Sequence, residues 1–127
     1  MNTTETIAGF AYVLGTILFT VYGQIVLKWQ VSKAGAIPAT LSERIPFLLS
    51  LILNPWVLSG LLGGFFAFLC WLGALTKFEL SYAYPFMSLA FVFVLVLSVG
   101  LFHEPLTAAK IIGVLLIIAG IIVGSRS

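Results

Sequence analysis

Long stretches without a charged side chain divide this sequence of 127 residues. No charge occurs between Thr6 and Leu27, between Ile45 and Thr76, between Leu80 and Phe102, or between Ile111 and Ser125. A helix needs about 20 mainly apolar residues to cross a bilayer. Because Asn54-Pro55 divides the second stretch, the pattern predicts helices at about 7–27, 55–76, 79–101 and 106–124. The predicted fold is an all-α membrane protein, a single four-helix transmembrane bundle that spans residues 1–127.

The connections between the predicted helices differ in length. Those near Lys77 and His103 are so short that the helices they join must be antiparallel neighbours. The long connection 29–54 reads as a polar loop followed by an interfacial or re-entrant helix, at about 46–53. Pro85 leaves the carbonyl of Ser81 without its helical donor and can kink the third helix. The first helix is expected to remain in the mature protein, because no basic segment precedes it.

The composition excludes several classes of protein. Hydrophobic residues make up 61% of the chain and charged residues only 8%, against about 25% charged in ordinary soluble domains. A soluble enzyme, a disordered chain and a nucleic-acid binder are therefore excluded. Aspartate is absent, and Cys70 and His103 are the only residues of their types. We therefore expect no enzymatic activity, no metal and no cofactor.

The basic residues are distributed unequally between the two ends of the predicted helices. Lys28, Lys33, Arg44 and Lys110 fall at one end, and Lys77 and Arg126 at the other. Cytoplasmic loops of membrane proteins carry an excess of lysine and arginine. The distribution favours a cytoplasmic position for the long connection.

Polar residues recur every four positions along the first helix, at Thr16, Thr20, Gln24 and Lys28. This spacing places them on one slowly drifting stripe. An amide in hydrocarbon is costly unless it is paired, so the stripe predicts a polar cavity. A lysine beside an amide suits an anion such as a lipid phosphate. In the alternative interpretation, the threonines bond to their own backbone and Lys28 only extends toward the headgroups.

A second polar group opens the third helix. Its candidate substrate-binding residues are Glu79, Tyr82, Tyr84 and Ser88. In the alternative interpretation, Glu79 is an anion at a helix N-terminus and the tyrosines belong to an interfacial aromatic belt. His103 is expected to be a solvated loop residue, and Glu104 to cap or anchor the last helix.

Small residues recur at four-residue spacing in two helices. Gly60 and Gly64 do so in the second helix. The last helix carries Ala109, Gly113, Gly120 and Gly124 on an otherwise aliphatic background. Such spacing lets helices approach closely in lipid. The face of the last helix is the candidate dimer interface.

Three segments carry a resemblance to a known family. They are Ala74-Leu-Thr-Lys-Phe-Glu-Leu-Ser-Tyr-Ala-Tyr-Pro85, Gly100-Leu-Phe-His-Glu-Pro-Leu-Thr107 and the glycine-containing last helix from Ile112. They resemble the drug/metabolite transporter superfamily, and the four-helix length resembles its small multidrug resistance branch. Tyr22-Gly-Gln-Ile-Val-Leu-Lys28 also resembles the related subunits that flip undecaprenyl-phosphate-linked aminoarabinose. The resemblance implies a multi-pass protein of the bacterial inner membrane.

One departure separates the branches of this superfamily. The multidrug exporters carry a glutamate in the middle of the first helix, whereas residues 9–23 contain no acid here. We therefore expect a dimeric flippase for a polyprenyl-phosphate sugar or a similar anionic lipid, as a homodimer or with a paralogue. The alternatives are a transporter of small cationic or polar solutes, which would depend on Glu79, and a membrane subunit that only scaffolds a partner.

Overall fold

The computed structural model describes residues 2–126, and helices account for most of them. The elements are α1 (Thr3–Ala34), α2 (Leu41–Ile52), α3 (Pro55–Lys77), α4 (Leu80–Ala83), the 3-10 helix η1 (Tyr84–Ser88), α5 (Leu89–Leu101) and α6 (Ala108–Gly124). Three segments are long and apolar enough to cross a membrane: α1, α3 and the run Leu80–Leu101. The apolar helix α6 is shorter. The predicted all-helical, apolar architecture is confirmed within the described residues.

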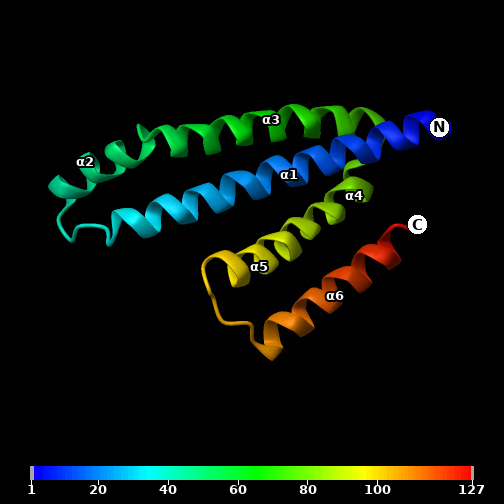
Figure 1. Cartoon of the computed structure of the whole chain (residues 1–127). Coiled ribbons are helices and arrows are strands. Elements are labelled where there is room, and N and C mark those ends of the chain that lie inside the picture. The colour runs from blue at the N-terminus through cyan, green and yellow to red at the C-terminus, as the bar shows by residue number, and fades with distance from the viewer. Residues whose placement is uncertain (1, 127) are drawn as a thin grey trace.

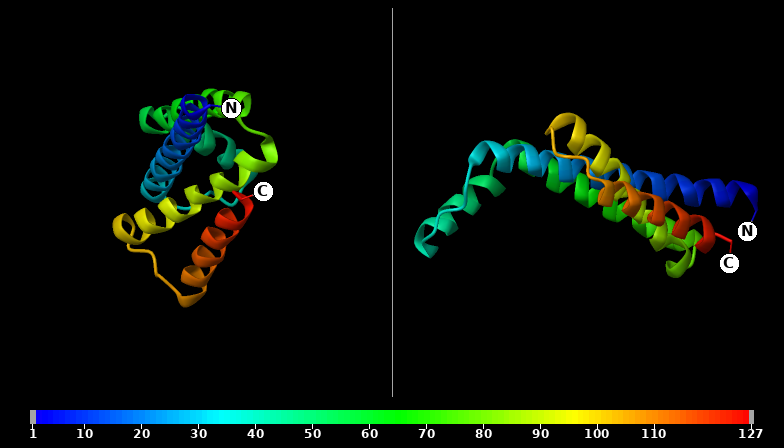
Figure 2. Two further views of the ribbon diagram at one scale, coloured as in Figure 1. Left: turned by 90° about the vertical axis from the view of Figure 1, so that its right-hand side faces the viewer. Right: turned by 90° about the horizontal axis from the view of Figure 1, so that it is seen from below.

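The long helices lie in the order α3, α1, α5, α6 (Figure 1). Helix α1 packs mainly against α3 and less extensively against α5. Figure 2 shows α5 and α6 displaced to one side of the α1–α3 pair. Both chain ends lie at the end of the molecule where α3 turns into α4. We call this the terminal end, and we call the end that holds α2 and the α5–α6 connection the loop end.

Glycines bring α1 and α3 into close contact. A Cβ at Gly23 would lie 3.1 Å from the carbonyl oxygen of Gly60, and one at Gly63 would lie 3.4 Å from the carbonyl oxygen of Phe19. A Cβ at Gly64 would meet nothing within 4 Å. Helix α3 therefore contacts α1 through Gly60 and Gly63, while Gly64 of the four-residue pair faces open space.

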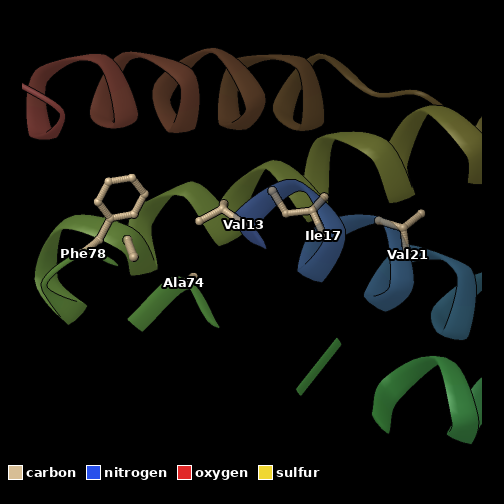
Figure 3. Close-up of a cluster of buried hydrophobic side chains, with 6 residues drawn as sticks. Val13, Ile17, Val21, Ala74 and Phe78 are labelled. Carbon is tan, nitrogen blue, oxygen red and sulfur yellow. The ribbon is translucent and has the colours of Figure 1, made fainter. Parts of the chain in front are cut away.

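A small apolar core forms where α1, α3 and α4 meet near the terminal end. It consists of Val13, Ile17, Val21, Ala74, Phe78 and Ala83 (Figure 3). The α5 residues packed against it are Leu89, Ala90 and Val94, all in the first half of that helix. Most other apolar side chains are exposed, as expected of helices that face lipid.

Helix α1 continues beyond the predicted end. The prediction ended it near Leu27 and began a loop at Trp29, whereas the helix runs to Ala34 and ends at Gly35, whose φ is 84°. A charged residue limits the apolar stretch but does not break a helix, since lysine and glutamine are good helix formers. Lys28 therefore lies inside the helix, with one and a half turns beyond it.

Helix α2 also begins earlier than predicted, at Leu41 instead of residue 46. Pro46 lies inside it and deprives the carbonyl of Ser42 of its helical donor. Ser42 is exposed, so that carbonyl is open to solvation. The starting point predicted for α3 is confirmed: Asn54 Oδ1 accepts hydrogen bonds from the backbone N–H groups of Trp56 at 2.8 Å and Val57 at 3.4 Å.

The predicted third helix, 79–101, is not continuous: the 3-10 segment η1 separates α4 from α5 around Pro85, where the sequence allows a kink. The predicted capping role of Glu104 is wrong. Helix α6 is capped by Thr107, whose hydroxyl accepts a hydrogen bond from the backbone N–H of Lys110 at 3.2 Å. Threonine suits this position because its short side chain reaches the N–H groups of the first turn. Glu104 lies before the cap and is available for another contact.

Replacing Asn54 with alanine should destabilise the joint between α2 and α3. The change removes both capping bonds and the bond that Asn54 Nδ2 donates to buried Gln30. We expect the free energy of unfolding to fall by about 2 kcal/mol, measured by denaturant titration in micelles. Asn2→Ala is the matched control, because Asn2 Oδ1 accepts one exposed backbone bond. Equal effects of the two substitutions would contradict the role of Gln30.

Candidate functional site

A groove of about 890 Å³ lies between α1 and α3 toward the loop end. Its walls are Phe19, Thr20, Gly23, Gln24 and Leu27 of α1, Ile52 of α2, and Val57, Leu58, Gly60, Leu61, Leu62, Gly64, Phe65 and Ala67 of α3. The volume lies within the range of about 300–1,000 Å³ that is typical of ligand sites. Thr20 and Gln24 are its only polar lining residues, so the groove is apolar with one polar edge.

The predicted polar stripe of α1 follows that edge. Each four-residue step rotates the position by about 40° around the helix. Thr16 is buried and donates a hydrogen bond from its hydroxyl to the carbonyl of Tyr12 at 2.8 Å. The side chains of Thr20 and Gln24 make no such bond to any residue in 2–126. The backbone-bonding interpretation is therefore confirmed for Thr16 alone.

The stripe ends at Lys28, next to the connection between α5 and α6. Lys28 Nζ lies 3.8 Å from Glu104 Oε1, with 53% and 36% of the two side chains exposed. An N–O distance of 3.8 Å exceeds the length of a charge-assisted hydrogen bond, which is about 2.7–2.9 Å. Lys28 therefore keeps its ammonium donors available while a carboxylate lies nearby.

A further polar cluster, which the sequence patterns did not indicate, lies where α1, α2 and α3 meet. Asn54 Nδ2 donates a hydrogen bond to Gln30 Oε1 at 3.2 Å. Gln30 Nε2 is buried without a partner among residues 2–126. Trp29 contacts Trp56 edge to face, and Lys33 Nζ lies 4.4 Å from the centre of the Trp29 ring. The sequence pattern places Gln30 in a loop and therefore does not indicate its burial at the start of α3.

The second predicted polar group lies at the terminal end. Tyr82 belongs to an aromatic cluster with Phe10, Phe78 and Phe86. Tyr84 is exposed and packs against Trp71. Glu79 is exposed at the N-terminus of α4, where its backbone carbonyl accepts the N–H groups of the first turn while its side chain makes no capping bond. Ser88 is half-buried just before α5.

The two predicted groups are not brought together. Tyr82 contacts the ring of Phe10, which is 18 positions before Lys28 on the same helix. At 1.5 Å per residue, this interval spans about 27 Å. Thr20 and Gln24 line the groove and Lys28 lies one turn beyond Gln24 on the same helix, while Glu79, Tyr82, Tyr84 and Ser88 belong to the opposite end.

The small residues predicted at the interface leave space along the surface of α6. A Cβ at Gly113, Gly120 or Gly124 would meet nothing within 4 Å, and Ala109 is exposed. No residue of α6 is buried. The small-residue face is thus accessible to lipid or to another protein.

Comparison with known sequences agrees with this architecture. The EamA-like transporter family matches residues 2–126, which is nearly the whole chain. The chain belongs to this family. The predicted resemblance to drug/metabolite transporters is thereby confirmed, and the apolar helices of this EamA-like chain identify a multi-pass membrane protein.

Two relatives of this EamA-like chain carry informative names. It is 34% identical over 123 residues to "Probable 4-amino-4-deoxy-L-arabinose-phosphoundecaprenol flippase subunit ArnF" of Aeromonas salmonicida, covering 94% of this chain and 81% of the relative. It is 33% identical over 122 residues to "Probable 4-amino-4-deoxy-L-arabinose-phosphoundecaprenol flippase subunit ArnE" of Pseudomonas aeruginosa, covering 92% of this chain and 96% of the relative. These names describe flippase subunits and not enzymes. No solved structure matches the chain.

Proposed function

We propose that this protein flips a polyprenyl-phosphate-linked sugar, or a similar anionic lipid, across the bacterial inner membrane. The observation that carries the proposal is the polar edge of the groove, where Thr20 and Gln24 lead to Lys28. A lipid phosphate needs a cation and hydrogen-bond donors, and an isoprenoid chain needs an apolar surface. Lys28 and Gln24 provide the cation and the donors, and the groove beside Gln24 provides the apolar surface. The names of the relatives support the same class of substrate.

In this proposal, Lys28 and Gln24 bind the phosphate and the groove accommodates the first isoprene units. The ammonium supplies charge, and the amide supplies two further donors. The middle of α1 contains no acid that would repel the phosphate. The alternative substrate, a cation, would depend on Glu79, which lies at the other end of the molecule from the groove.

The terminal-end group takes part after the head group has crossed the membrane. Flipping moves the sugar from one interface to the other, so polar side chains are needed at both. Exposed Tyr84 and Glu79 and half-buried Ser88 offer hydroxyl and carboxylate groups there. Tyr82 adds an aromatic face suited to a sugar ring.

The architecture proposed for transport is a dimer of four-helix subunits. Helix α6 has 17 residues, so it spans about 25 Å, slightly less than the hydrocarbon core. Four helices enclose little space, and a second copy or a paralogous subunit would complete the pathway. The accessible small-residue face at Ala109, Gly113, Gly120 and Gly124 is the proposed contact. The excess of basic residues at the loop end favours a cytoplasmic position for that end.

Replacing Lys28 with alanine should weaken binding of undecaprenyl phosphate at least about ten-fold, because a hydrogen bond to a charged group is lost. Native mass spectrometry of protein released from micelles measures the bound fraction, normalised per subunit. Flipping in reconstituted liposomes should fall in parallel. Helicity and thermal unfolding should remain unchanged, since Lys28 is half exposed.

Lys33→Ala provides the matched control. It removes an equal charge from the same helix and the same end, but its ammonium lies over Trp29. If both variants lose binding equally, the lysines attract anionic lipid only through general charge and the proposed site is wrong. If Lys28→Ala binds and flips lipid like the wild type, the proposed function itself is contradicted.

A further inference from the structure

The α5–α6 connection is built to present one carboxylate to α1. His103 adopts a left-handed backbone with φ of 55°, which residues with side chains rarely adopt. The backbone N–H of Glu104 then bonds to the carbonyl of Ser98 at 3.3 Å. On the other side, Lys110 Nζ donates to the carbonyl of Pro105 at 2.9 Å. These bonds fix the backbone on both sides of Glu104.

This carboxylate provides a polar link between α1 and the α5–α6 pair at the loop end. The α5 residues that pack against the core stop at Val94. Beyond that point, the Lys28–Glu104 ion pair joins α1 to the connection. The pair is long and exposed, and exposed ion pairs contribute little to stability. It is therefore a contact that a stronger anion can replace.

We propose that Glu104 is the resident counter-ion of Lys28 and that a lipid phosphate displaces it on binding. The inference rests on the proposed function, because it assigns the phosphate to Lys28. The ammonium of Lys28 can pair with either the carboxylate or the phosphate. The phosphate offers more acceptor oxygens and can bind at a shorter N–O distance than the 3.8 Å of the Glu104 pair. Displacement also breaks the ion pair between α1 and the α5–α6 connection.

Glu104→Gln tests the competition with a side chain of the same shape. Removing the carboxylate should tighten binding of undecaprenyl phosphate by about two- to five-fold, the range expected for an exposed ion pair. Native mass spectrometry titration with this lipid provides the measurement. Glu43→Gln is the matched control, because Glu43 lies exposed on α2 at the same end and should leave the affinity unchanged.

The double variant Lys28→Ala/Glu104→Gln separates the possible outcomes. If Glu104 acts through Lys28, its removal changes nothing once Lys28 is absent. Unchanged or weaker binding by Glu104→Gln, with binding still dependent on Lys28, would overturn the competition and leave the proposed function standing. An equal gain with Glu43→Gln would also overturn it, because the effect would then be general charge. Binding independent of Lys28 would instead refute the proposed function.

Glu104→Asp keeps the experiment decisive if the glutamine variant unfolds. Aspartate keeps the charge but withdraws it from Lys28 by one methylene group. We expect an affinity between those of the wild type and Glu104→Gln. An affinity equal to that of the wild type would contradict competition at this distance.

Discussion

Gly23→Leu is expected to separate α1 from α3 and to lower the free energy of unfolding by about 3 kcal/mol. A Cβ at this position would lie 3.1 Å from the carbonyl oxygen of Gly60. That oxygen belongs to the backbone of α3 and is held by the helix, so it cannot rotate away as a side chain would. The two helices must move apart and lose their packing.

Denaturant titration in micelles, followed by helicity and by Trp fluorescence, measures this loss. Gly64→Leu is the control, because a Cβ there meets nothing within 4 Å. Leucine is the better helix former by about 1 kcal/mol, so the control should be neutral or more stable. The two substitutions are chemically identical and should change stability in opposite directions. A stable Gly23→Leu variant would mean that the helices do not meet at this glycine.

Smaller substitutions should reveal an asymmetry across the same contact. A Cβ at Gly60 would lie 3.5 Å from the carbonyl oxygen of Gly23, an ordinary van der Waals distance. Gly60→Ala should therefore fold normally, whereas Gly23→Ala requires a small shift of α3. Unfolding midpoints measured under the same conditions should rank Gly23→Ala below Gly60→Ala. The reverse order would contradict the register of the two helices.

The apolar helices could be predicted because lipid restricts which sequences can cross it. Charged residues are excluded from the hydrocarbon core, so gaps between charges indicated the three segments that are long enough to span. The end of α1 could not be predicted in this way. Lys28 marks the limit of the apolar stretch, but the first residue that breaks the helix is Gly35. Hydropathy indicates whether lipid or water surrounds a helix. It does not indicate where the backbone hydrogen bonding of the helix ends.

The polar edge of the groove could be predicted from the sequence. The separation of the two predicted polar groups, at opposite ends of the molecule, could be predicted only in part. Four-residue spacing requires Thr20, Gln24 and Lys28 to share one face of a helix, whatever surrounds it. Spacing does not state what lies opposite that face. Helices that each cross the membrane alternate in direction, so the third is expected to begin on the side where the first begins. Tyr82 is therefore expected far from Lys28, and no residue pattern joined the two groups into one site.

The contact between Lys28 and Glu104 required the structure. Antiparallel connectivity places both residues at the loop end, but several charges share that end. The left-handed backbone at His103 turns the connection so that Glu104 is the charged residue that lies beside Lys28. Likewise, the burial of Gln30 depends on how far α1 extends and on the position of Asn54. Such pairings depend on tertiary geometry, which no local pattern contains.

A substitution that fills the groove tests whether the isoprenoid chain of the lipid binds there. Gly64 lines the groove and has open space around it, so Gly64→Leu should insert an isobutyl group where the isoprenoid chain is proposed to lie. We expect binding of undecaprenyl phosphate to fall about ten-fold, as overpacking of a site costs about 1–3 kcal/mol. Native mass spectrometry measures the bound fraction, and Gly100→Leu, at another open glycine outside the groove, should bind normally.

Chain length then separates the tail from the phosphate. Dimethylallyl phosphate carries the phosphate on a single isoprene unit, too short to fill the groove. Its binding, followed by NMR titration, should be unaffected in Gly64→Leu and lost in Lys28→Ala, whereas undecaprenyl phosphate should lose affinity in both. Equal losses of the two ligands in Gly64→Leu would place the phosphate, and not the chain, in the groove. No loss of either would mean that the chain lies elsewhere, between subunits or in the surrounding bilayer.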